Sequence, residues 1–376
     1  MKVRVLLTDG LQRKTLVAAR SLGRAGYEPW VADDTTFSLA RWSRYAGRAL
    51  RSPRPGSAAF QDWLLAVAAE VDLVLPMDDL STAAAIACGD ALTAKSLLPT
   101  AEQFEIGRDK WRTMELAVRA GVPHPESVPV GTEGDLADAR AMLGGEVVLR
   151  PRVGSGGRGV RYLPQHLEAL PADLRGHLVQ RRLPRGRKFD VGLLYARDGS
   201  LRATFCQEEL RWFPGEHGTS TLQRSVVRDD LVGLSRQLLQ PIGWTGLAEV
   251  EWLEAPDGSP QLLEINPRPW ASLGLAVAAG VDFPRLWAEL ALGQTVSGPA
   301  AYDTAVLCRW SLPSDLLHLL RHPLRGLAKG APRRLPGERL VDDIVDPGDL
   351  GPVGGFLLAV LGHLFDIGTW RQVMRW

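Results

Sequence analysis

The stretch QLLEINPRPW, residues 261–270, carries three polar side chains at alternate positions. Successive side chains of a β-strand point to opposite faces, so Glu264, Asn266 and Arg268 share one face while the apolar residues share the other. A carboxylate, an amide and a guanidinium that converge beside a buried face require partners, because unpaired polar groups are costly to bury. This stretch is therefore the first candidate for a chemical site.

A second strand-like segment, GLAEVEWL (246–253), precedes it, and the linking EAPDGS contains Asp-Gly, a strong hairpin signal. The hairpin sets Glu251, 13 residues before Glu264, on the neighbouring strand. Oxygen ligands with open coordination positions suit Mg²⁺, which binds through one or two carboxylates plus substrate phosphates. The sequence predicts a metal site formed by Glu251, Glu264 and Asn266, with a structural polar cluster as the alternative.

A glycine-rich loop, VGSGGRGV (153–160), lies between two strand-like segments. Such a loop lets backbone N–H groups approach phosphate oxygens, although a merely flexible hairpin is the competing interpretation. It does not read GxxxxGK[ST], and the loop after the first strand, TDGLQRKT, lacks GxGxxG. The sequence therefore predicts neither a P-loop nor a dinucleotide-binding domain. The predicted phosphate-binding residues are Gly154, Ser155, Gly156, Gly157 and Gly159.

Composition limits the class of protein. The 376 residues are 45% hydrophobic and 23% charged, with a net charge of +1, which predicts a globular chain without a nucleic-acid partner. Three scattered cysteines without metal-binding spacing favour a reducing compartment, and no secretion signal is visible, so we expect a cytoplasmic protein. Residues 351–368 contain about ten contiguous apolar residues, short of the ~20 that span a bilayer. We expect no integral membrane segment there, but a buried helix or a homodimer contact, with peripheral membrane contact as the lesser alternative.

The order of strand and helix patterns predicts the domains. Residues 1–104 alternate strands with helices, which indicates a parallel α/β domain. A smaller unit with the glycine-rich loop is expected over 105–177, and a larger unit with the hairpin over 178–299. Residues 300–376 are predicted to form a helical extension. Four residues of the first domain follow strands, the usual position for ligand contacts: Asp9, Gly10, Asp78 and Asp79.

Five motifs in sequence order resemble the ATP-grasp superfamily, the fold of D-alanine D-alanine ligase, biotin carboxylase and carbamoyl phosphate synthetase, with the carboxylate-amine ligase branch nearest. They are RDK (108–110), GSGGRGV (154–160), LVQRRLP (178–184), GLAEVEW (246–252) and LLEINPRPW (262–270). The resemblance implies an α/β fold: a pre-ATP-grasp parallel α/β domain, an ATP-grasp domain of two α+β subdomains, and the helical C-terminal tail.

The resemblance also implies ATP and Mg²⁺ (or Mn²⁺) as cofactors, and a role for each matching residue. Glu251, Glu264 and Asn266 would bind metal, Arg268 would face the transferring phosphoryl group, and Arg224 would contact the substrate carboxylate. Nucleotide contacts are implied for the glycine-rich loop and for Lys110, Arg150, Gln180, Arg181, Arg182, Leu183 and Lys188. A substrate-side loop is expected over 208–226, with Glu209, Arg211, His217, Thr219 and Ser220; His217 reads more simply as a surface histidine.

Two positions depart from the pattern. Arg150 stands where the family usually has lysine, and Arg181 with Arg182 stand where relatives often show an acidic and an aromatic residue. Arginine and lysine are not equivalent around phosphate, since the guanidinium is larger, planar and bidentate. Only six of the 44 basic residues are lysine, so a general shift to arginine accounts for the first change. Because the charge is kept, we expect ATP binding to be retained.

These features predict an ATP-dependent carboxylate-amine ligase that forms an amide or peptide bond through an acyl phosphate and releases ADP and phosphate. The expected partners are a small carboxylate and an amine, with an amino acid or peptide favoured. Alternatives are a carbamoyl or carboxylation reaction, a thiol or hydroxyl acceptor, or a non-catalytic nucleotide-binding protein. A nicotinamide dehydrogenase is opposed by the missing GxGxxG.

Overall fold

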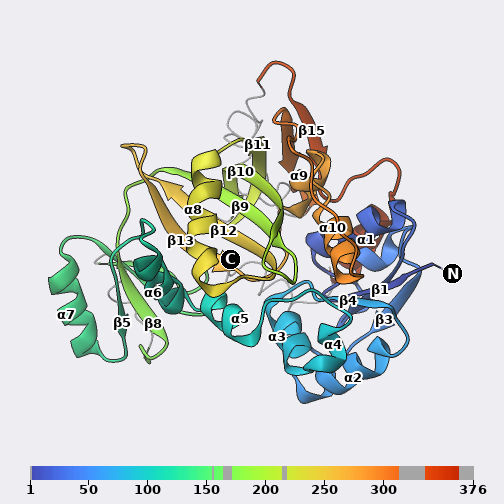
Figure 1. Cartoon of the computed structure of the whole chain (residues 1–376), viewed down its shortest axis with the longest axis horizontal. Helices are drawn as coiled ribbons and strands as arrows, with labels where there is room; N and C mark the ends of the chain where they lie inside the picture. The colour runs from blue at the N-terminus through green and yellow to red at the C-terminus, as the bar shows by residue number, and fades with distance from the viewer. Residues whose placement is uncertain (1, 155, 164–171, 214–217, 313–334, 364–376) are drawn as a thin grey trace.

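Three β-sheets, one in each of three structural units, organise the chain (Figure 1). The structure is a computed structural model that describes residues 2–154, 156–163, 172–213, 218–312 and 335–363. In Figure 1 the N-terminal unit, in blue, and the small unit, in green, lie at opposite ends, with the largest sheet between them. The predicted α/β fold class is confirmed.

The N-terminal sheet is parallel, with strand order β3-β2-β1-β4. Alternate residues of β1 face opposite sides: Val5 and Leu7 pack with α1, while Leu6 packs with α2 and α3. The strand order reverses between β1 and β4, so the loops after these two strands border the crevice where open α/β sheets bind ligands. The elements are β1 (Arg4–Leu7), α1 (Arg13–Arg24), β2 (Glu28–Asp33), η1 (Ala40–Trp42), β3 (Arg48–Arg51), α2 (Ala58–Ala68), β4 (Leu73–Leu75), α3 (Asp79–Ala87) and α4 (Asp90–Thr93).

The small sheet is antiparallel, with order β5-β8-β6-β7, and is covered by α7. Thr132 and Asp135 form a capping box that starts α7, and Leu136 and Leu143 of this helix pack on Val147 and Leu149. The glycine-rich loop joins β6 to β7, as predicted. The elements are β5 (Ser127–Val130), α7 (Glu133–Leu143), β6 (Val147–Pro151), β7 (Arg161–Leu163) and β8 (His177–Arg181).

The large sheet has seven strands in the order β13-β12-β9-β10-β11-β14-β15. Helices α5, α6 and α8 supply the apolar core on one face, and α8 crosses in front of the sheet in Figure 1. Helices α5 and α6 thus pack with the large sheet, although they fall mainly within the segment expected for the small unit. The elements are α5 (Ala101–Arg108), α6 (Lys110–Ala120), β9 (Arg187–Tyr195), β10 (Leu201–Phe213), β11 (Thr219–Val226), α8 (Asp229–Leu239), η3 (Gln240–Ile242), β12 (Gly246–Glu254) and β13 (Pro260–Asn266).

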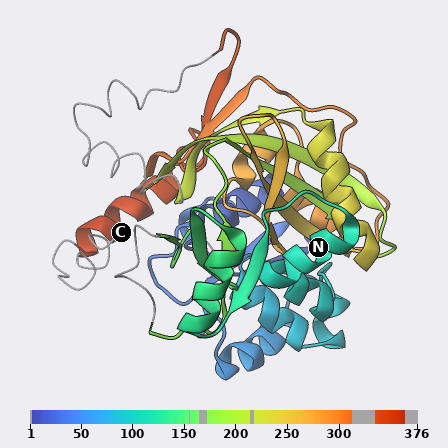
Figure 2. The same cartoon turned by 90° about the vertical axis from the view of Figure 1, so that its left-hand side faces the viewer.

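The C-terminal region differs from the expected helical extension. Strands β14 (Val306–Arg309) and β15 (Arg339–Asp342) extend the large sheet beyond β11. Each strand has only four residues, too few for a clear period in the sequence, and pairing them covers the otherwise open edge of β11. The helices that the structure describes in this half are α9 (Leu273–Ala278), α10 (Phe283–Ala291) and α13 (Gly351–His363). Figure 2 shows α13, in red, at the outer edge of the molecule.

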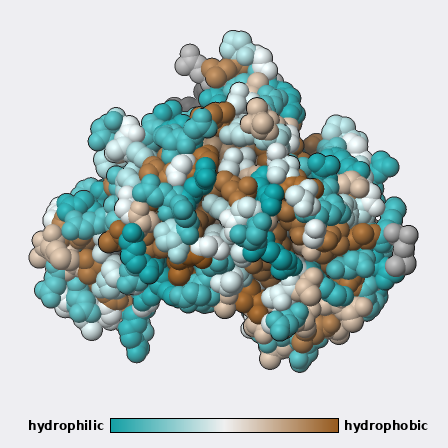
Figure 3. Space-filling model, in the orientation of Figure 1, coloured by the Kyte–Doolittle hydropathy of each residue, from teal (hydrophilic) through white to brown (hydrophobic). Residues whose placement is uncertain are grey.

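The surface seen in Figure 3 mixes hydrophilic and hydrophobic residues, with a largely hydrophilic exterior on the small unit at the left. In the part of the chain that the structure describes, no helix combines the length and apolar character needed to cross a membrane. The homodimer contact expected over 351–368 stays a prediction.

Candidate active site

A cavity of about 1280 Å³ lies where the three units meet. The N-terminal unit contributes Gln12, Arg13, Lys14 and Asp78 to its lining. The small unit and the hinge after it contribute Arg150, Gly156, Gly157, Tyr162, Gln180, Arg181, Arg182 and Leu183. The large sheet contributes Lys188, Asp190, Glu209, Trp212, Thr219, Ser220, Glu249, Glu251, Glu264 and Asn266, followed by Arg268, Ser272 and Trp310. The structure thus gathers most of the predicted site residues around one hollow.

A row of polar residues crosses the cavity face of the large sheet. Glu264 lies opposite Glu251, Glu251 opposite Asp190, and Asp190 opposite Gln207. The pleat places their chain neighbours on the other face, where Ile265, Val250, Val191 and Cys206 join the apolar core. The alternation predicted for the hairpin therefore extends over four strands.

Two cations hold the carboxylate of Glu264. Lys110 Nζ lies 3.1 Å, and Arg150 Nη2 2.8 Å, from Glu264 Oε2. Burial acts to raise the pKa of Glu264, but Lys110 and Arg150 outweigh it and lower that pKa to about 2. Lys110 Nζ also donates to the carbonyl of Gly154 at 2.6 Å, which ties the glycine-rich loop to the same centre. The cations predicted for nucleotide phosphate are therefore beside the predicted metal ligand.

Asn266 joins two further carboxylates on the next strand. Its Nδ2 donates to Glu249 Oε2 at 3.0 Å and to Glu251 Oε1 at 2.8 Å, while Arg268 Nη2 donates to Asn266 Oδ1 at 3.0 Å. Burial and the neighbouring Glu264 and Glu249 raise the pKa of Glu251 well above its usual value. Burial raises the pKa of Glu249 to about 8, against the opposing effect of Arg268. Crowded buried carboxylates of this kind favour a bound cation.

The donor set is the one that Mg²⁺ prefers, with carboxylate and amide oxygens only. Within the described residues, no three acidic, histidine or cysteine side chains converge closely enough to hold a metal ion by themselves. Mg²⁺ usually completes its coordination with water and substrate phosphates, so an open oxygen set fits a metal that arrives with a nucleotide. The metal assignment to Glu251, Glu264 and Asn266 stays a prediction.

The glycine-rich loop fits a phosphate group. Gly156 and Gly157 line the cavity with φ of 66° and 69°, a left-handed conformation that glycine adopts without strain. Gly154 and Gly159 are not in the lining, and a Cβ on Gly159 would lie 2.7 Å from Pro151 Cγ. Ser155 lies outside the described residues.

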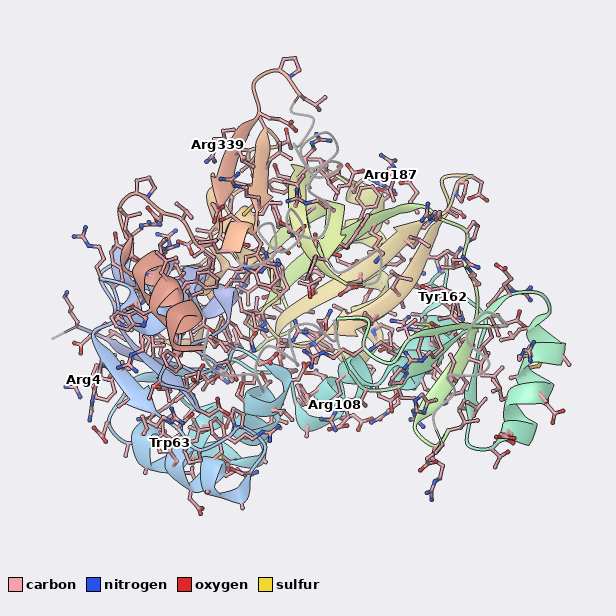
Figure 4. The ribbon with its side chains drawn as sticks, turned by 180° about the vertical axis from the view of Figure 1, so that it is seen from behind. Arg4, Trp63, Arg108, Tyr162, Arg187 and Arg339 are labelled. Carbon is pink, nitrogen blue, oxygen red and sulfur yellow. The ribbon has the colours of Figure 1, made fainter. Side chains whose placement is uncertain are left out.

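The hinge arginines are bound to acids of the small unit. Arg181 Nη2 lies 2.6 Å from Glu126 Oε2, and Arg182 pairs with Glu146. Arg182 also stacks over Tyr162, which is labelled in Figure 4, at 5.1 Å from the ring centroid. Nucleotide binding by the hinge stays a prediction; Leu183 and the two arginines line the cavity.

Polar residues of the N-terminal unit meet the large sheet through Asp78. Gln12 Nε2 donates to Asp78 Oδ2 at 2.6 Å, Lys14 Nζ lies 3.2 Å from Asp78 Oδ1, and Arg268 Nε lies 3.6 Å from the same atom. Burial acts to raise the pKa of Asp78, but Lys14 and Arg268 hold it well below its usual range. Arg268 therefore connects the hairpin with the crevice of the first sheet.

One predicted catalytic residue lies elsewhere. Arg224 is outside the cavity lining and pairs with Glu338, so the expected contact with substrate is corrected. The pleat gives the reason: Gln223 lies opposite the cavity-lining Glu209, so its neighbour Arg224 faces the other side of β11. From the substrate-side loop, Glu209, Thr219 and Ser220 line the cavity, whereas Arg211 donates to Thr221 Oγ1. His217 lies outside the described residues.

Several lining residues were not predicted. Glu249 sits two positions before Glu251, so the period-two rule alone could have found it. Asp190, Gln12, Arg13, Lys14 and Trp310 carry no local pattern and meet only through tertiary structure.

Comparison with known proteins agrees with this architecture. A family model described as "ATP-grasp in the biosynthetic pathway with Ter operon" matches residues 208–311. The N5-carboxyaminoimidazole ribonucleotide synthase of Pseudomonas aeruginosa is 28% identical over 262 residues, which cover 62% of this chain and 67% of that protein.

Two solved structures show the same fold. N5-carboxyaminoimidazole synthetase from Staphylococcus aureus superposes with a TM-score of 0.67 and 14% identity, covering 81% of each chain. The biotin carboxylase domain of Hydrogenobacter thermophilus 2-oxoglutarate carboxylase superposes with a TM-score of 0.64 and 16% identity, covering 79% of this chain and 71% of that one. The latter crystal structure is a complex with MgADP, ADP and bicarbonate.

Proposed function

We propose, because residues 208–311 match an ATP-grasp family model and the fold is that of N5-carboxyaminoimidazole synthetase, that this chain is an ATP-grasp enzyme and an ATP-dependent carboxylate-amine ligase, which joins a small carboxylate to an amine and releases ADP and phosphate. The observation that carries the proposal is the arrangement around Glu264. Two cations, a glycine-rich loop and an oxygen-only hairpin converge there on one cavity.

Each part of this arrangement has a task in phosphoryl transfer, which depends on positioning and charge neutralisation more than on covalent help from the protein. Lys110 and Arg150 hold phosphate oxygens, and the backbone of Gly156 and Gly157 approaches them without side-chain obstruction. Glu251, Glu264 and Asn266 hold Mg²⁺, or Mn²⁺ in its place. When bound, the metal supplies charge neutralisation at the phosphates.

The remaining residues orient the carboxylate. Arg268, fixed by Asn266 and the acids after β4, stabilises negative charge on the group that receives the phosphoryl. The product of that step is an acyl phosphate, which an amine attacks with loss of phosphate. A site that excludes water would protect this acyl phosphate from hydrolysis. This route needs no side-chain nucleophile.

A carboxylation reaction is the second candidate. The relatives are named for N5-carboxyaminoimidazole ribonucleotide synthesis and for biotin carboxylase, and one of those structures contains bicarbonate. Bicarbonate would then be the carboxylate that is phosphorylated. None of these names supports the amino acid or peptide substrate expected from the sequence.

The test is ADP release from Mg·ATP by the full-length protein, with pools of amines combined with bicarbonate, aliphatic carboxylates or aromatic carboxylates. We expect release with one pool. Glu264→Gln should reduce that release by about 10²–10³-fold, since it removes a charged ligand of the metal that neutralises the phosphates.

The matched control is Glu254→Gln, on the same hairpin but outside the cavity, where Glu254 pairs with Arg187 and Arg228. It should keep the rate within about twofold. Unchanged release in Glu264→Gln would contradict the assignment of this site. Thermal stabilisation by ATP without ADP release from any pool would favour a nucleotide-binding protein instead.

A further inference from the structure

An acidic segment near the C-terminus is tied to the first long helix of the chain. Arg13 Nη1 lies 2.7 Å from Asp343 Oδ2, with side chains 5% and 0% exposed. Arg20 Nε lies 2.9 Å from Asp349 Oδ2, and these side chains are buried as well. Arg13 and Arg20 are seven residues apart, two turns of α1, and so share one face of the helix. Residues 343–349 therefore fix the position of α1.

A third pair in the same segment, Arg24 with Asp346, is exposed: its side chains are 47% and 22% accessible. It lies at the far end of α1 from the cavity. It uses the same residue types as the buried pairs, but neither Arg24 nor Asp346 lines the cavity. This pair is therefore a natural control for the buried ones.

The buried pair at Arg13 reaches the cavity through an indole ring. The Arg13 guanidinium lies 4.4 Å from the ring centroid of Trp310, and Arg13 Nη2 donates to the carbonyl of Ser220 at 2.9 Å. Trp310 follows β14 and donates its backbone N–H to the carbonyl of Thr221. Arg13, Ser220 and Trp310 all line the cavity. Asp343 is not in the cavity lining itself, but its ion pair holds Arg13, which is part of one wall of the cavity.

A second indole borders the same part of β11 from its other side. Trp212 lies opposite Ser220 in the β10–β11 ladder, and Lys188 Nζ lies 5.2 Å from its ring centroid. Glu209 accepts a hydrogen bond from the Trp212 indole N–H. Because β10 and β14 are the two neighbours of β11, the two indoles flank residues 219–221. Each carries a cation at its ring.

We propose that Trp212 and Trp310 form a specificity wall that binds the ring of a flat, carboxylate-bearing substrate, and that Asp343 is the positioning residue that holds Arg13 against Trp310. Indoles favour stacked or edge contacts with other rings, which supports a ring-bearing substrate, and the carboxylate of that substrate is taken from the proposed function. The substrate class rests on the proposed function, but the wall is testable without turnover. It also gives the C-terminal region a role in the site.

The experiment is saturation-transfer NMR on the full-length protein with Mg·ADP, using benzoate as the ring-bearing probe and propionate as the aliphatic one. We expect benzoate to bind about five- to tenfold more tightly than propionate, the size of one good aromatic contact. Trp310→Ala should remove this preference. Asp343→Asn should weaken benzoate binding several-fold, whereas Asp346→Asn should leave it unchanged.

Calorimetric titration with Mg·ADP on the same proteins checks that the nucleotide end is intact, and should give the same affinity in all four. Equal binding of benzoate and propionate to the unmodified protein would overturn the wall, as would unchanged benzoate binding in Trp310→Ala. Equal effects of Asp343→Asn and Asp346→Asn would overturn the positioning role. If benzoate binds as expected but no substrate pool releases ADP, the ligase proposal fails while the wall stands.

Discussion

The two ends of the cavity are built in different ways. At the nucleotide end, the key carboxylates and the amide sit at alternate positions of a single hairpin, with their cations in two nearby motifs. At the substrate end, the lining comes from residues 12–14, 78, 212–213, 218–220 and 310, and Asp343 holds Arg13 of this lining. In the proposed function, the chemistry of the reaction would depend on short local motifs, whereas the choice of substrate would depend on tertiary packing.

The largest expected effect is a loss of stability when the ion pair behind the substrate end of the cavity is broken. Asp343→Asn leaves the Arg13 charge buried without a carboxylate, which costs about 3–5 kcal/mol. Burial raises the pKa of the Asp343 carboxyl, and Arg13 opposes that rise. The contact with Arg13 therefore helps to keep the buried carboxylate charged. Asp346→Asn, at an exposed pair, should cost about 0–1 kcal/mol. Urea unfolding of both variants measures the difference, and similar midpoints would remove the distinction between the two pairs.

The nucleotide end should show the opposite behaviour, because its crowded acids oppose folding. The pKa of Glu249 is about 8 in the folded protein, above its ordinary value of 4.5, so its contribution to stability is full below pH 4.5 and is lost as pH rises through 8. Glu249→Gln should therefore gain about 1–3 kcal/mol relative to the unmodified protein between pH 5 and pH 9. Thermal unfolding of both proteins in EDTA at pH 5 and pH 9 tests this. The same difference in stability between the variant and the unmodified protein at both pH values would contradict the prediction.

Metal binding probes the pairing of Glu264 with its two cations. Since Lys110 and Arg150 neutralise this carboxylate, we expect Mn²⁺ alone to bind about tenfold more weakly than Mn²⁺ with ADP, whose phosphates offer the cations another partner. Arg150→Met should bring the affinities for Mn²⁺ with and without ADP closer together. Electron paramagnetic resonance of free Mn²⁺ measures both values, and a ratio unaffected by Arg150→Met would show that the pair does not restrain the metal.

The smallest effect is expected at the hinge. Arg181 is paired with Glu126, and both side chains are about half exposed. Arg181→Ala should therefore change the affinity for ADP by less than about threefold, as exposed ion pairs contribute little. Calorimetric titration measures this affinity. A large loss of affinity for ADP would mean that the Arg181 guanidinium leaves Glu126 to contact the nucleotide.

The polar face of the hairpin could be predicted from the sequence because each motif there is short and has its own physical logic. Alternation placed Glu264, Asn266 and Arg268 on one face, and the same rule explains Glu249. The same rule was not applied to Arg224. It follows Gln223, which lies opposite the cavity-lining Glu209, so Arg224 faces away from the cavity. Trp310 and Asp343 each follow a strand of four residues, and both contact Arg13, hundreds of positions earlier in the chain, so no local pattern could have found them.

The buried ion pairs between α1 and residues 343–349 also determine when, during synthesis, the substrate end of the cavity can reach its final form. Arg13 leaves the ribosome early, but its partner Asp343 lies 330 residues further along the chain. The residues of the N-terminal sheet are also made early, but one face of that sheet shares its apolar core with residues 273–291, 306 and 344. The substrate end cannot be fixed until nearly the whole chain is made. A truncated or unfinished chain would therefore possess the β12–β13 hairpin while lacking the ion pair that fixes Arg13 in the cavity wall.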